Sequence, residues 1–227
     1  MLNVKNTIVD TLLSVVAPHL CSGCGRIGGA FCDNCKYDIS VDPFSSCLLC
    51  EKPSQTGVCS DHKVAFNQAW AVGVRSGALQ RLIGSFKFRN MKSASVDLSD
   101  LLHKMLPPLP MGSIFVPIPT TPAHIRERGY DHMLLIAEGL GRLRSLPVEQ
   151  LLKRDNVLIQ HKAGRKQRLI QASTAFRVEG VIDPEAVYIL LDDVVTTGAT
   201  IIEASLLLRQ AGATTIWVAT TSRQPLD

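Results

Sequence analysis

Residues 187–200, which read VYILLDDVVTTGAT, decide the fold. The continuous apolar run 187–191 is typical of a strand that is covered on both faces in a parallel sheet. Asp192 and Asp193 are expected to end this strand. A small loop rich in hydroxyl groups follows, residues 196–200, and the chain then changes to helical spacing.

Ile201, Ala204, Leu208 and Ala211 share one helical face, and Gly212 is a typical C-terminal glycine. Residues 214–221 return to a strand pattern. The segment is therefore predicted to be a strand–loop–helix–strand unit whose loop follows the carboxyl end of the first strand. Ligands bind at such loops in open α/β sheets.

The composition of this loop indicates the ligand. Backbone N–H groups at a helix N-terminus, together with threonine hydroxyls and a glycine, can cradle a phosphate. Asp192 and Asp193 would repel that phosphate, but they suit hydrogen bonds from sugar hydroxyls nearby. A phosphorylated ribose would suit both the phosphate-binding loop and the two carboxylates. The alternative is an ordinary turn capped by threonines beside an exposed acidic pair.

Composition limits the class of protein. The chain has 227 residues, of which 46% are hydrophobic and 19% charged, so it is long enough for one α/β domain with a small appendage and is not disordered. No apolar run reaches the ~18 residues of a membrane-spanning helix. The net charge of +4 favours phosphates without establishing a nucleic-acid partner. Asp10 interrupts the apolar stretch 8–17, which makes it a poor signal peptide, so we expect a cytoplasmic protein. One helical face is shared by Val4, Ile8, Leu12 and Val15, which predicts a short amphipathic helix docked on the protein, with a membrane-surface role as the alternative.

All seven cysteines lie between residues 21 and 59. They occur as Cys21-x-x-Cys24, Cys32-x-x-Cys35 and Cys47-x-x-Cys50, followed by Cys59-x-x-His62. These eight residues are enough for two tetrahedral zinc sites. A disulfide framework would leave one cysteine unpaired, and it does not suit a reducing compartment. A redox or iron–sulfur role is a further alternative.

The pairing of these ligands is open from the sequence. A sequential arrangement joins Cys21, Cys24, Cys32 and Cys35 in one site and Cys47, Cys50, Cys59 and His62 in the other. It closes shorter loops than a cross-braced arrangement, so we favour it. If His62 is an ordinary surface histidine, the second site has three cysteines. Closed four-ligand sites leave no position for a substrate, so the module is expected to be structural.

The middle of the chain offers basic residues beside a second loop. Residues 113–119 are predicted to form a strand that ends at a sheet rim, because Pro117 and Pro119 cannot donate to a central ladder. A helical stripe follows, formed by Met133, Ile136, Ala137, Leu140 and Leu143. Residues 68–75 are expected to be a strand and 79–88 a helix. The basic segment 153–168 suits a mobile loop over an anionic leaving group, or an ordinary basic surface loop.

Residues 189–200 resemble the phosphoribosyl pyrophosphate (PRPP) motif of type I phosphoribosyltransferases. The resemblance implies that Asp192 and Asp193 bind the ribose hydroxyls and that the loop binds the 5′-phosphate. The loop residues are Thr196, Thr197, Gly198 and Thr200, and Val194, Val195 and Ala199 complete the binding segment.

The whole layout resembles the ComF proteins, which include amidophosphoribosyltransferase-like proteins linked to DNA uptake and use. The resemblance rests on the cysteine pairs, the PRPP motif and four further segments: 86–89 (FKFR), 117–119 (PIP), 126–130 (RERGY) and 152–154 (LKR). Two features depart from the expected pattern. His62 stands where a cysteine is expected, and 160–165 (QHKAGR) replaces a Gln-x-Gly-Leu-like pattern.

The resemblance implies a zinc-binding module over 1–65 and a type I phosphoribosyltransferase domain, an α/β fold with a mostly parallel sheet, over 66–227. It implies two structural Zn²⁺ ions, and Mg²⁺ bound with PRPP. Thr120 and Thr121, in the loop 119–122, are expected to hold the pyrophosphate. Basic side chains near it are expected to be Lys87, Arg89, Arg126, Arg128 and Lys162. Asp192, Asp193, Arg126 and Arg128 are the expected catalytic residues.

Three functions follow from this resemblance. The first is a PRPP-dependent phosphoribosyltransferase whose acceptor the sequence does not identify. The second is a protein that handles single-stranded DNA in natural transformation and uses PRPP or a nucleotide as a ligand. The third is a PRPP-sensing regulator without catalysis. A helicase-like competence protein is a partner that the family suggests.

Overall fold

The computed structural model describes residues 20–27, 31–40, 44–89, 91–154 and 176–226. The expected N-terminal amphipathic helix, Lys162 and most of the basic segment 153–168 lie outside the described residues. None of the helices in the described ranges combines the length and the apolar character needed to cross a bilayer.

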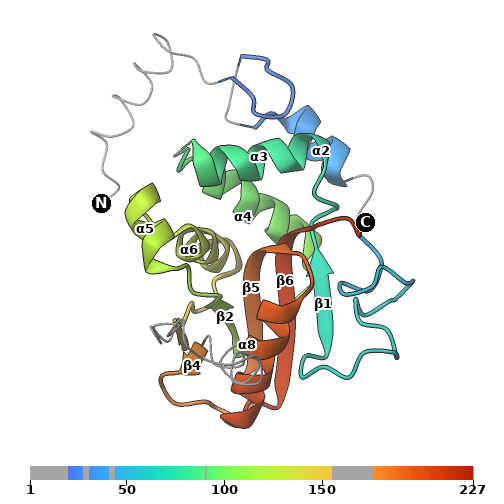
Figure 1. Ribbon diagram of the computed structural model, residues 1–227, viewed down its shortest axis with the longest axis vertical. Coiled ribbons are helices and arrows are strands. Elements are labelled where there is room, and N and C mark those ends of the chain that lie inside the picture. Colours follow the sequence, from blue (N-terminus) through green and yellow to red (C-terminus); the bar gives the residue numbers. More distant parts are fainter. Residues whose placement is uncertain (1–19, 28–30, 41–43, 90, 155–175, 227) are drawn as a thin grey trace, which may run out of the picture.

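The centre of the molecule is a four-stranded parallel sheet in the order β1-β6-β5-β2 (Figure 1). Its strands are β1 (Gln68–Ala71), β2 (Ser113–Pro117), β5 (Val187–Val195) and β6 (Thr215–Arg223). The apolar run at residues 187–191 becomes the central part of β5, with a neighbour on each side. The prediction of an α/β protein with a parallel sheet is therefore confirmed.

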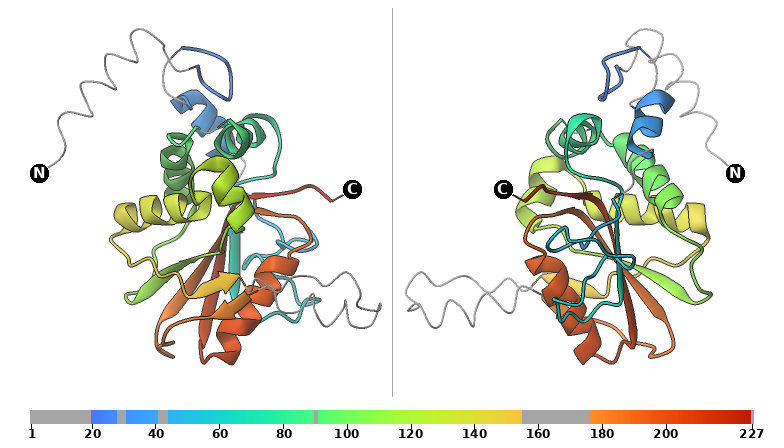
Figure 2. Two further views of the ribbon diagram at one scale, coloured as in Figure 1. Left: turned by 60° about the vertical axis from the view of Figure 1, so that its left-hand side comes forward. Right: turned by 90° about the vertical axis from the view of Figure 1, so that its right-hand side faces the viewer.

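The helices are α2 (Asp33–Ser40), α3 (Gly77–Phe88), α4 (Ala94–Met105), α5 (Pro122–Arg128), α6 (His132–Arg144) and α8 (Ala199–Gln210). A small antiparallel pair is formed by β3 (Leu152–Arg154) and β4 (Phe176–Val178). Figure 2 shows α4 and α6 on one side of the sheet and α8 on the other. The sheet is thus covered on both faces, as continuous apolar strands require.

Two hydrophobic cores fill these layers, and β5 contributes to both. Ile189 and Leu191 pack with α3, α4 and α6 on one face. Tyr188 and Leu190 pack with α8 on the other face. The cysteine segments divide in the same way: Cys21 and Cys35 join the first core, whereas Leu48, which follows Cys47, joins the second.

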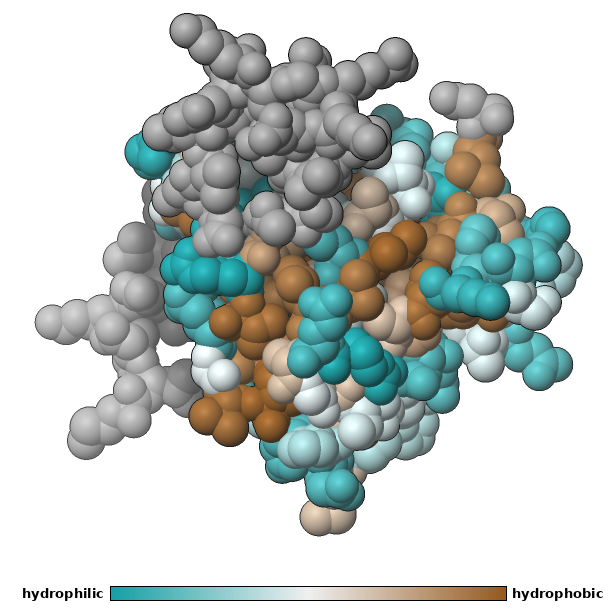
Figure 3. All heavy atoms as spheres, turned by 60° about the horizontal axis from the view of Figure 1, so that its bottom comes forward, coloured by the Kyte–Doolittle hydropathy of each residue, from teal (hydrophilic) through white to brown (hydrophobic). Residues whose placement is uncertain are grey.

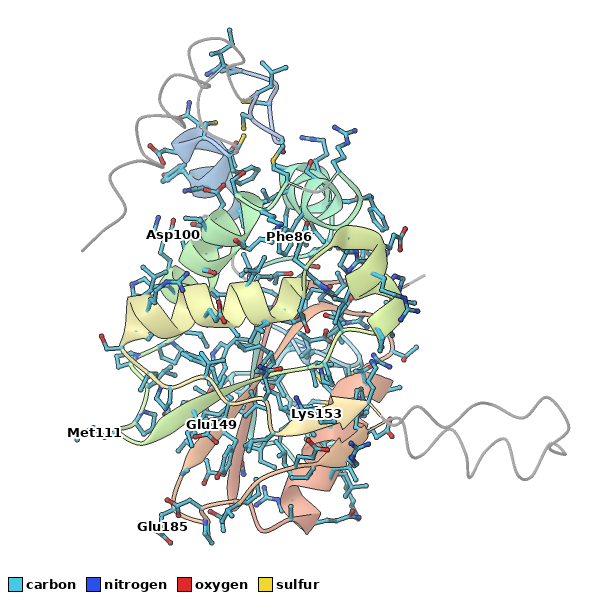
Figure 4. The ribbon with its side chains drawn as sticks, turned by 90° about the vertical axis from the view of Figure 1, so that its left-hand side faces the viewer. Phe86, Asp100, Met111, Glu149, Lys153 and Glu185 are labelled. Carbon is cyan, nitrogen blue, oxygen red and sulfur yellow. The ribbon has the colours of Figure 1, made fainter. Side chains whose placement is uncertain are left out.

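Buried contacts between helices fix the end of α3 beside α6. Phe86 lies among the side chains between the helices (Figure 4) and stacks on Tyr130, with ring centroids 5.5 Å apart. The Tyr130 hydroxyl donates a hydrogen bond to the Phe86 carbonyl oxygen. Lys87, the next residue, is thereby held near the amino end of α6.

Two details differ from the predictions. Asp192 and Asp193 do not end the strand, because the ladder with β6 continues through Val195 and Arg223. Hydroxyls of β6 stabilise this continuation, since Thr221 Oγ1 donates to the Asp193 carbonyl oxygen at 2.5 Å. Leu143, expected in the buried stripe of its helix, is 48% exposed because it lies in the last turn of α6.

The two ends of the sheet differ in character. Figure 3 views the molecule from the end where the strands begin, and hydrophobic and hydrophilic side chains are interleaved over its described surface. At the opposite end, β2 and β5 lead into the loops before α5 and α8. Those loops position the candidate site.

Candidate functional site

A cleft of about 260 Å³ lies at the carboxyl ends of β2 and β5. It is lined by residues from α3, the loop before α5, α5 itself, α6, β3, β5 and the start of α8. Its polar lining residues are Lys87, Thr120, Thr121, His124, Arg128, His132, Arg154, Asp192, Asp193 and Thr200. This is the end of a parallel sheet at which ligands are expected.

Asp193 is the most strongly bonded of these residues. It is buried, and its Oδ2 lies 2.5 Å from Lys87 Nζ and 2.5 Å from His132 Nε2. Burial opposes ionisation, but the hydrogen bond from His132 and the charge of Lys87 outweigh it and hold the pKa of Asp193 below its ordinary value. Asp193 is therefore a carboxylate at neutral pH.

His132 links Asp193 to Arg128, and its hydrogen-bond partners assign its tautomer. Arg128 Nη1, which can only donate, lies 3.0 Å from His132 Nδ1. Nδ1 is therefore the acceptor, and the proton is on Nε2, which donates to Asp193. The imidazole thus joins a buried cation to a buried carboxylate.

Asp192 has a different environment from its neighbour. It is partly buried, and its Oδ1 accepts a hydrogen bond from the Asp193 backbone N–H at 2.9 Å. Burial and the nearby Asp193 carboxylate raise the pKa of Asp192. The two carboxyls therefore titrate apart, with Asp192 the readier to hold a proton.

The loop between β5 and α8 exposes Thr196 and Thr197, as the sequence predicts for a ligand-binding loop. Gly198 is the N-cap of α8, with a φ of 79° in the left-handed region that favours glycine. Gly198 has no side chain to cap this helix, whereas Thr121 caps α5 and Asp131 caps α6. The Ala199 N–H donates to Thr197 Oγ1 at 3.4 Å, so this hydroxyl lies at the start of α8 together with backbone N–H groups of the kind that bind anions.

Both predicted threonines lie in the loop after β2, and their side chains have different roles. Thr120 is buried in the cleft and donates to Asp131 Oδ1 at 2.7 Å. Thr121 Oγ1 accepts from the His124 backbone N–H at 3.3 Å and so caps α5. The side chain of Thr120 therefore joins this loop to the start of α6.

The predicted basic residues separate into two groups. Lys87 and Arg128 line the cleft. Arg126 is exposed on α5, and Arg89 is exposed beside a neighbouring groove along α3. Lys162 lies outside the described residues.

The sequence predictions missed three charged or titratable residues of the cleft: His124, His132 and Arg154. His132 directly follows the helix cap Asp131 and lies four residues after Arg128, which is the one signal for it in the sequence. Arg154 ends β3, donates from Nε to the Pro119 carbonyl oxygen at 2.8 Å and lies over the Phe176 ring. Only the packing of β3 beside the loop after β2 places Arg154 in the cleft.

The cysteines and His62 gather into two clusters in the sequential arrangement. Within each cluster the ligand atoms lie within 4.8 Å of one another. The clusters are Cys21, Cys24, Cys32 and Cys35, and Cys47, Cys50, Cys59 and His62. All seven cysteines are free thiols, so the structure contains no disulfide between them.

The geometry of both clusters fits a tetrahedral metal ion. Cys21 and Cys35 have their Sγ atoms 3.7 Å apart, as do Cys24 and Cys32. A tetrahedral ion with a Zn–S bond of about 2.3 Å separates its sulfur ligands by about 3.8 Å. His62 Nε2 is buried and has no hydrogen-bond partner within the described residues, as expected of a metal ligand. These residues can therefore hold two Zn²⁺ ions.

The known proteins to which this chain is similar in sequence include three competence proteins. The chain is 29% identical to competence protein ComFC of Streptococcus pneumoniae, over 86% of this chain and 83% of that protein. It is 28% identical to competence protein F of Haemophilus influenzae, over 91% of each chain. It is also 28% identical to competence protein ComFC of Bacillus subtilis, over 80% of this chain and 78% of that protein.

Among solved structures, the allosteric regulatory enzyme of purine biosynthesis aligns with a TM-score of 0.43 at 18% identity. Glutamine PRPP amidotransferase from B. subtilis aligns with a TM-score of 0.42 at 19% identity. Each alignment covers 57% of this chain, which spans about a quarter of those longer chains, 25% and 26%.

No family model matches the chain. The similarity to the competence proteins nevertheless extends over most of its length. The resemblance to the ComF competence proteins that these motifs indicate is thereby confirmed.

Proposed function

We propose that the cleft binds PRPP together with Mg²⁺ and that the protein is a phosphoribosyltransferase serving DNA uptake. The observation that carries this proposal is the placement of Asp192 and Asp193 near the carboxyl end of β5, shortly before the loop that starts α8. Adjacent carboxyls suit a ribose diol, and backbone N–H groups at a helix start suit a phosphate. The names of the relatives support the link to competence.

The residues of the cleft then take separate roles. Residues 196–200 hold the 5′-phosphate, and Asp192 and Asp193 accept hydrogen bonds from the ribose hydroxyls. Lys87 and Arg128 face the pyrophosphate, next to the loop of Thr120 and Thr121. Mg²⁺, bound with PRPP, supplies positive charge to the pyrophosphate and the ribose hydroxyls.

The reaction breaks the bond between ribose C1 and the pyrophosphate oxygen, and the pyrophosphate leaves with the electron pair. A bond from the acceptor to C1 replaces it. Fixed cations stabilise the charge that develops on the leaving group, and the carboxylates orient the ring. No protein nucleophile is needed for this displacement.

The test is calorimetric titration of PRPP in the presence of Mg²⁺. We expect micromolar binding by the wild type and loss of binding in the double variant Asp192→Asn, Asp193→Asn. Circular dichroism and metal analysis of the variant show whether its fold and its metals are retained. Unchanged affinity in a folded double variant would contradict the assignment.

A second candidate function is the handling of single-stranded DNA. A groove of about 530 Å³ runs along α3 beside Ser22, lined by Arg81, Arg89 and the 71% exposed Phe88. Arginines bind backbone phosphates, and an exposed aromatic ring stacks with bases. This proposal predicts binding of an oligonucleotide that weakens steeply with salt and is lost in Phe88→Ala combined with Arg89→Ala. Absence of binding at low salt would exclude it.

A further inference from the structure

The second cysteine–histidine cluster touches the loop proposed to bind the 5′-phosphate. Leu49 lies between the ligands Cys47 and Cys50. A Cβ added to Gly198 would lie 2.2 Å from Leu49 Cδ2, so the loop and this turn are in direct contact. Gly198 is buried, although its neighbours Thr197 and Ala199 are exposed. The turn between these two metal ligands therefore forms the inner support of the loop.

Arg223 also links this loop to the turn that contains Leu49. It is 0% exposed, and its Nη1 donates to the Val195 carbonyl oxygen at 3.2 Å. Its Nη2 donates to the Leu49 carbonyl oxygen at 3.3 Å. Val195 is the last residue of β5, directly before Thr196. One buried guanidinium therefore bridges the metal-binding turn and the start of the loop.

The charge of Arg223 is balanced from the same turn. Glu51 Oε1, one residue beyond Cys50, lies 4.0 Å from Arg223 Nε. The same carboxylate oxygen accepts from the Leu226 backbone N–H at 3.3 Å. A buried cation without such partners would carry a large desolvation cost. Moving the turn would therefore disturb Arg223 as well as Leu49.

The first cluster has a different neighbour. Its turn, at Ser22 and Gly23, is held by α3, because Arg81 Nη2 donates to the Gly23 carbonyl oxygen at 2.6 Å. Its buried ligands pack in the core on the other face of the sheet. The two clusters thus offer an internal comparison: the second supports the loop before α8, and the first supports α3.

We infer that the second metal cluster positions the 5′-phosphate loop, with Leu49 and Arg223 as positioning residues. This inference rests on the proposed function. A loop that binds phosphate through backbone N–H groups must be fixed before the ligand arrives, or its ordering lowers the affinity. A metal-closed turn is a rigid support for it, and loss of that metal frees Leu49 from Gly198.

The test uses two ligands that report on different parts of the cleft. Ribose 5-phosphate depends on the loop at 196–200, and pyrophosphate on the loop after β2. With Mg²⁺ present, Leu49→Ala is expected to weaken ribose 5-phosphate binding at least about fivefold. Pyrophosphate binding and both metals are expected to be retained. Leu49→Met, which keeps the contact, and Lys52→Ala, an exposed change on the same turn, are the matched controls.

A second comparison addresses the metals themselves. Cys50→Ser and Cys24→Ser each alter the second cysteine of a C-x-x-C pair, in the second and the first cluster respectively. Each is expected to lose one metal. Only Cys50→Ser is expected to lose affinity for ribose 5-phosphate while keeping affinity for pyrophosphate.

Each result has a distinct meaning. Equal ribose 5-phosphate affinity in wild type, Leu49→Ala and Cys50→Ser would overturn the positioning role while leaving the proposed function in place. Parallel loss of both ligands in Leu49→Ala would also overturn it, because it would show general destabilisation. Absence of ribose 5-phosphate and PRPP binding by the wild type would overturn the proposed function, and this inference with it.

Discussion

Lys87 Nζ lies 2.5 Å from Asp193 Oδ2, which joins the last turn of α3 to the end of β5. Both side chains are mostly buried, 16% and 12% exposed, so solvent screens this pair weakly. In the proposed complex Lys87 faces the pyrophosphate, and Asp193 faces the ribose. The ion pair thus holds two ligand-binding groups in place within the cleft.

Replacing Lys87 by methionine keeps the aliphatic stem and removes the charge. We expect the affinity for PRPP to fall at least about tenfold, because pyrophosphate loses a cation and Asp193 loses its lysine partner, keeping only His132. Calorimetric titration measures this. Arg89→Met is the matched variant from the same helix end, and its exposed position predicts a smaller effect. A larger effect of Arg89→Met would reverse the two assignments.

Replacing His132 by phenylalanine keeps an aromatic ring but removes both hydrogen bonds. Arg128 Nη1 then loses its hydrogen bond to the ring and Asp193 keeps only Lys87, and each buried bond lost costs about 1–3 kcal/mol. We expect a lower free energy of unfolding at neutral pH, measured by denaturant titration. His132→Gln, which retains a donor and an acceptor, is expected to lose less. Equal stability of wild type and His132→Phe would contradict the network.

The pH dependence of PRPP binding tests Asp192. Burial and the charge of Asp193 raise its pKa to about 7, so the carboxylate that accepts from ribose forms only as the pH rises through that value. Affinity is therefore expected to increase from about pH 6 to about pH 8. Conversely, the raised pKa makes ionised Asp192 a destabilising group, so its contribution to stability falls as the pH rises from its ordinary pKa of 3.8 to about 7 and is constant above that value.

Asp192→Asn separates this effect from titration of the ligand. The phosphates of PRPP titrate in the same way for both proteins, so any dependence that remains in the variant belongs to the ligand. We expect the increase to be smaller in Asp192→Asn. Identical pH profiles would show that ionisation of Asp192 does not control binding.

The sequence predicted the central unit of the fold because its signals are local. The apolar run at 187–191, the glycine at 198 and the helical stripe after it each depend on neighbouring residues. The end of β5 was predicted wrongly, since its pairing with β6 continues to Val195 and depends on hydroxyls far along the chain. A long-range partner leaves no local signal in the strand itself.

The sequence predicts those site residues whose pattern has few ordinary structural explanations. The adjacent carboxylates and the cysteine pairs are such cases, and the structure gathers the cysteines as the shorter-loop argument favours. Arg126 and Arg128 look alike in sequence, yet only Arg128 enters the cleft. The rotation of α5 and the packing of α6 decide between them. His132 was missed because a histidine at a helix start has many ordinary structural roles.

The last prediction concerns His62, the ligand that departs from the cysteine pattern. Its buried Nε2 has no protein partner within the described residues and lies with three thiols. We expect metal analysis to give two Zn²⁺ per wild-type chain, and His62→Ala to retain one after dialysis against a chelator, since three thiols leave the second ion open to exchange. His62→Cys completes a four-cysteine site and is expected to restore the second ion. Two tightly held ions in His62→Ala would show that His62 is not a ligand.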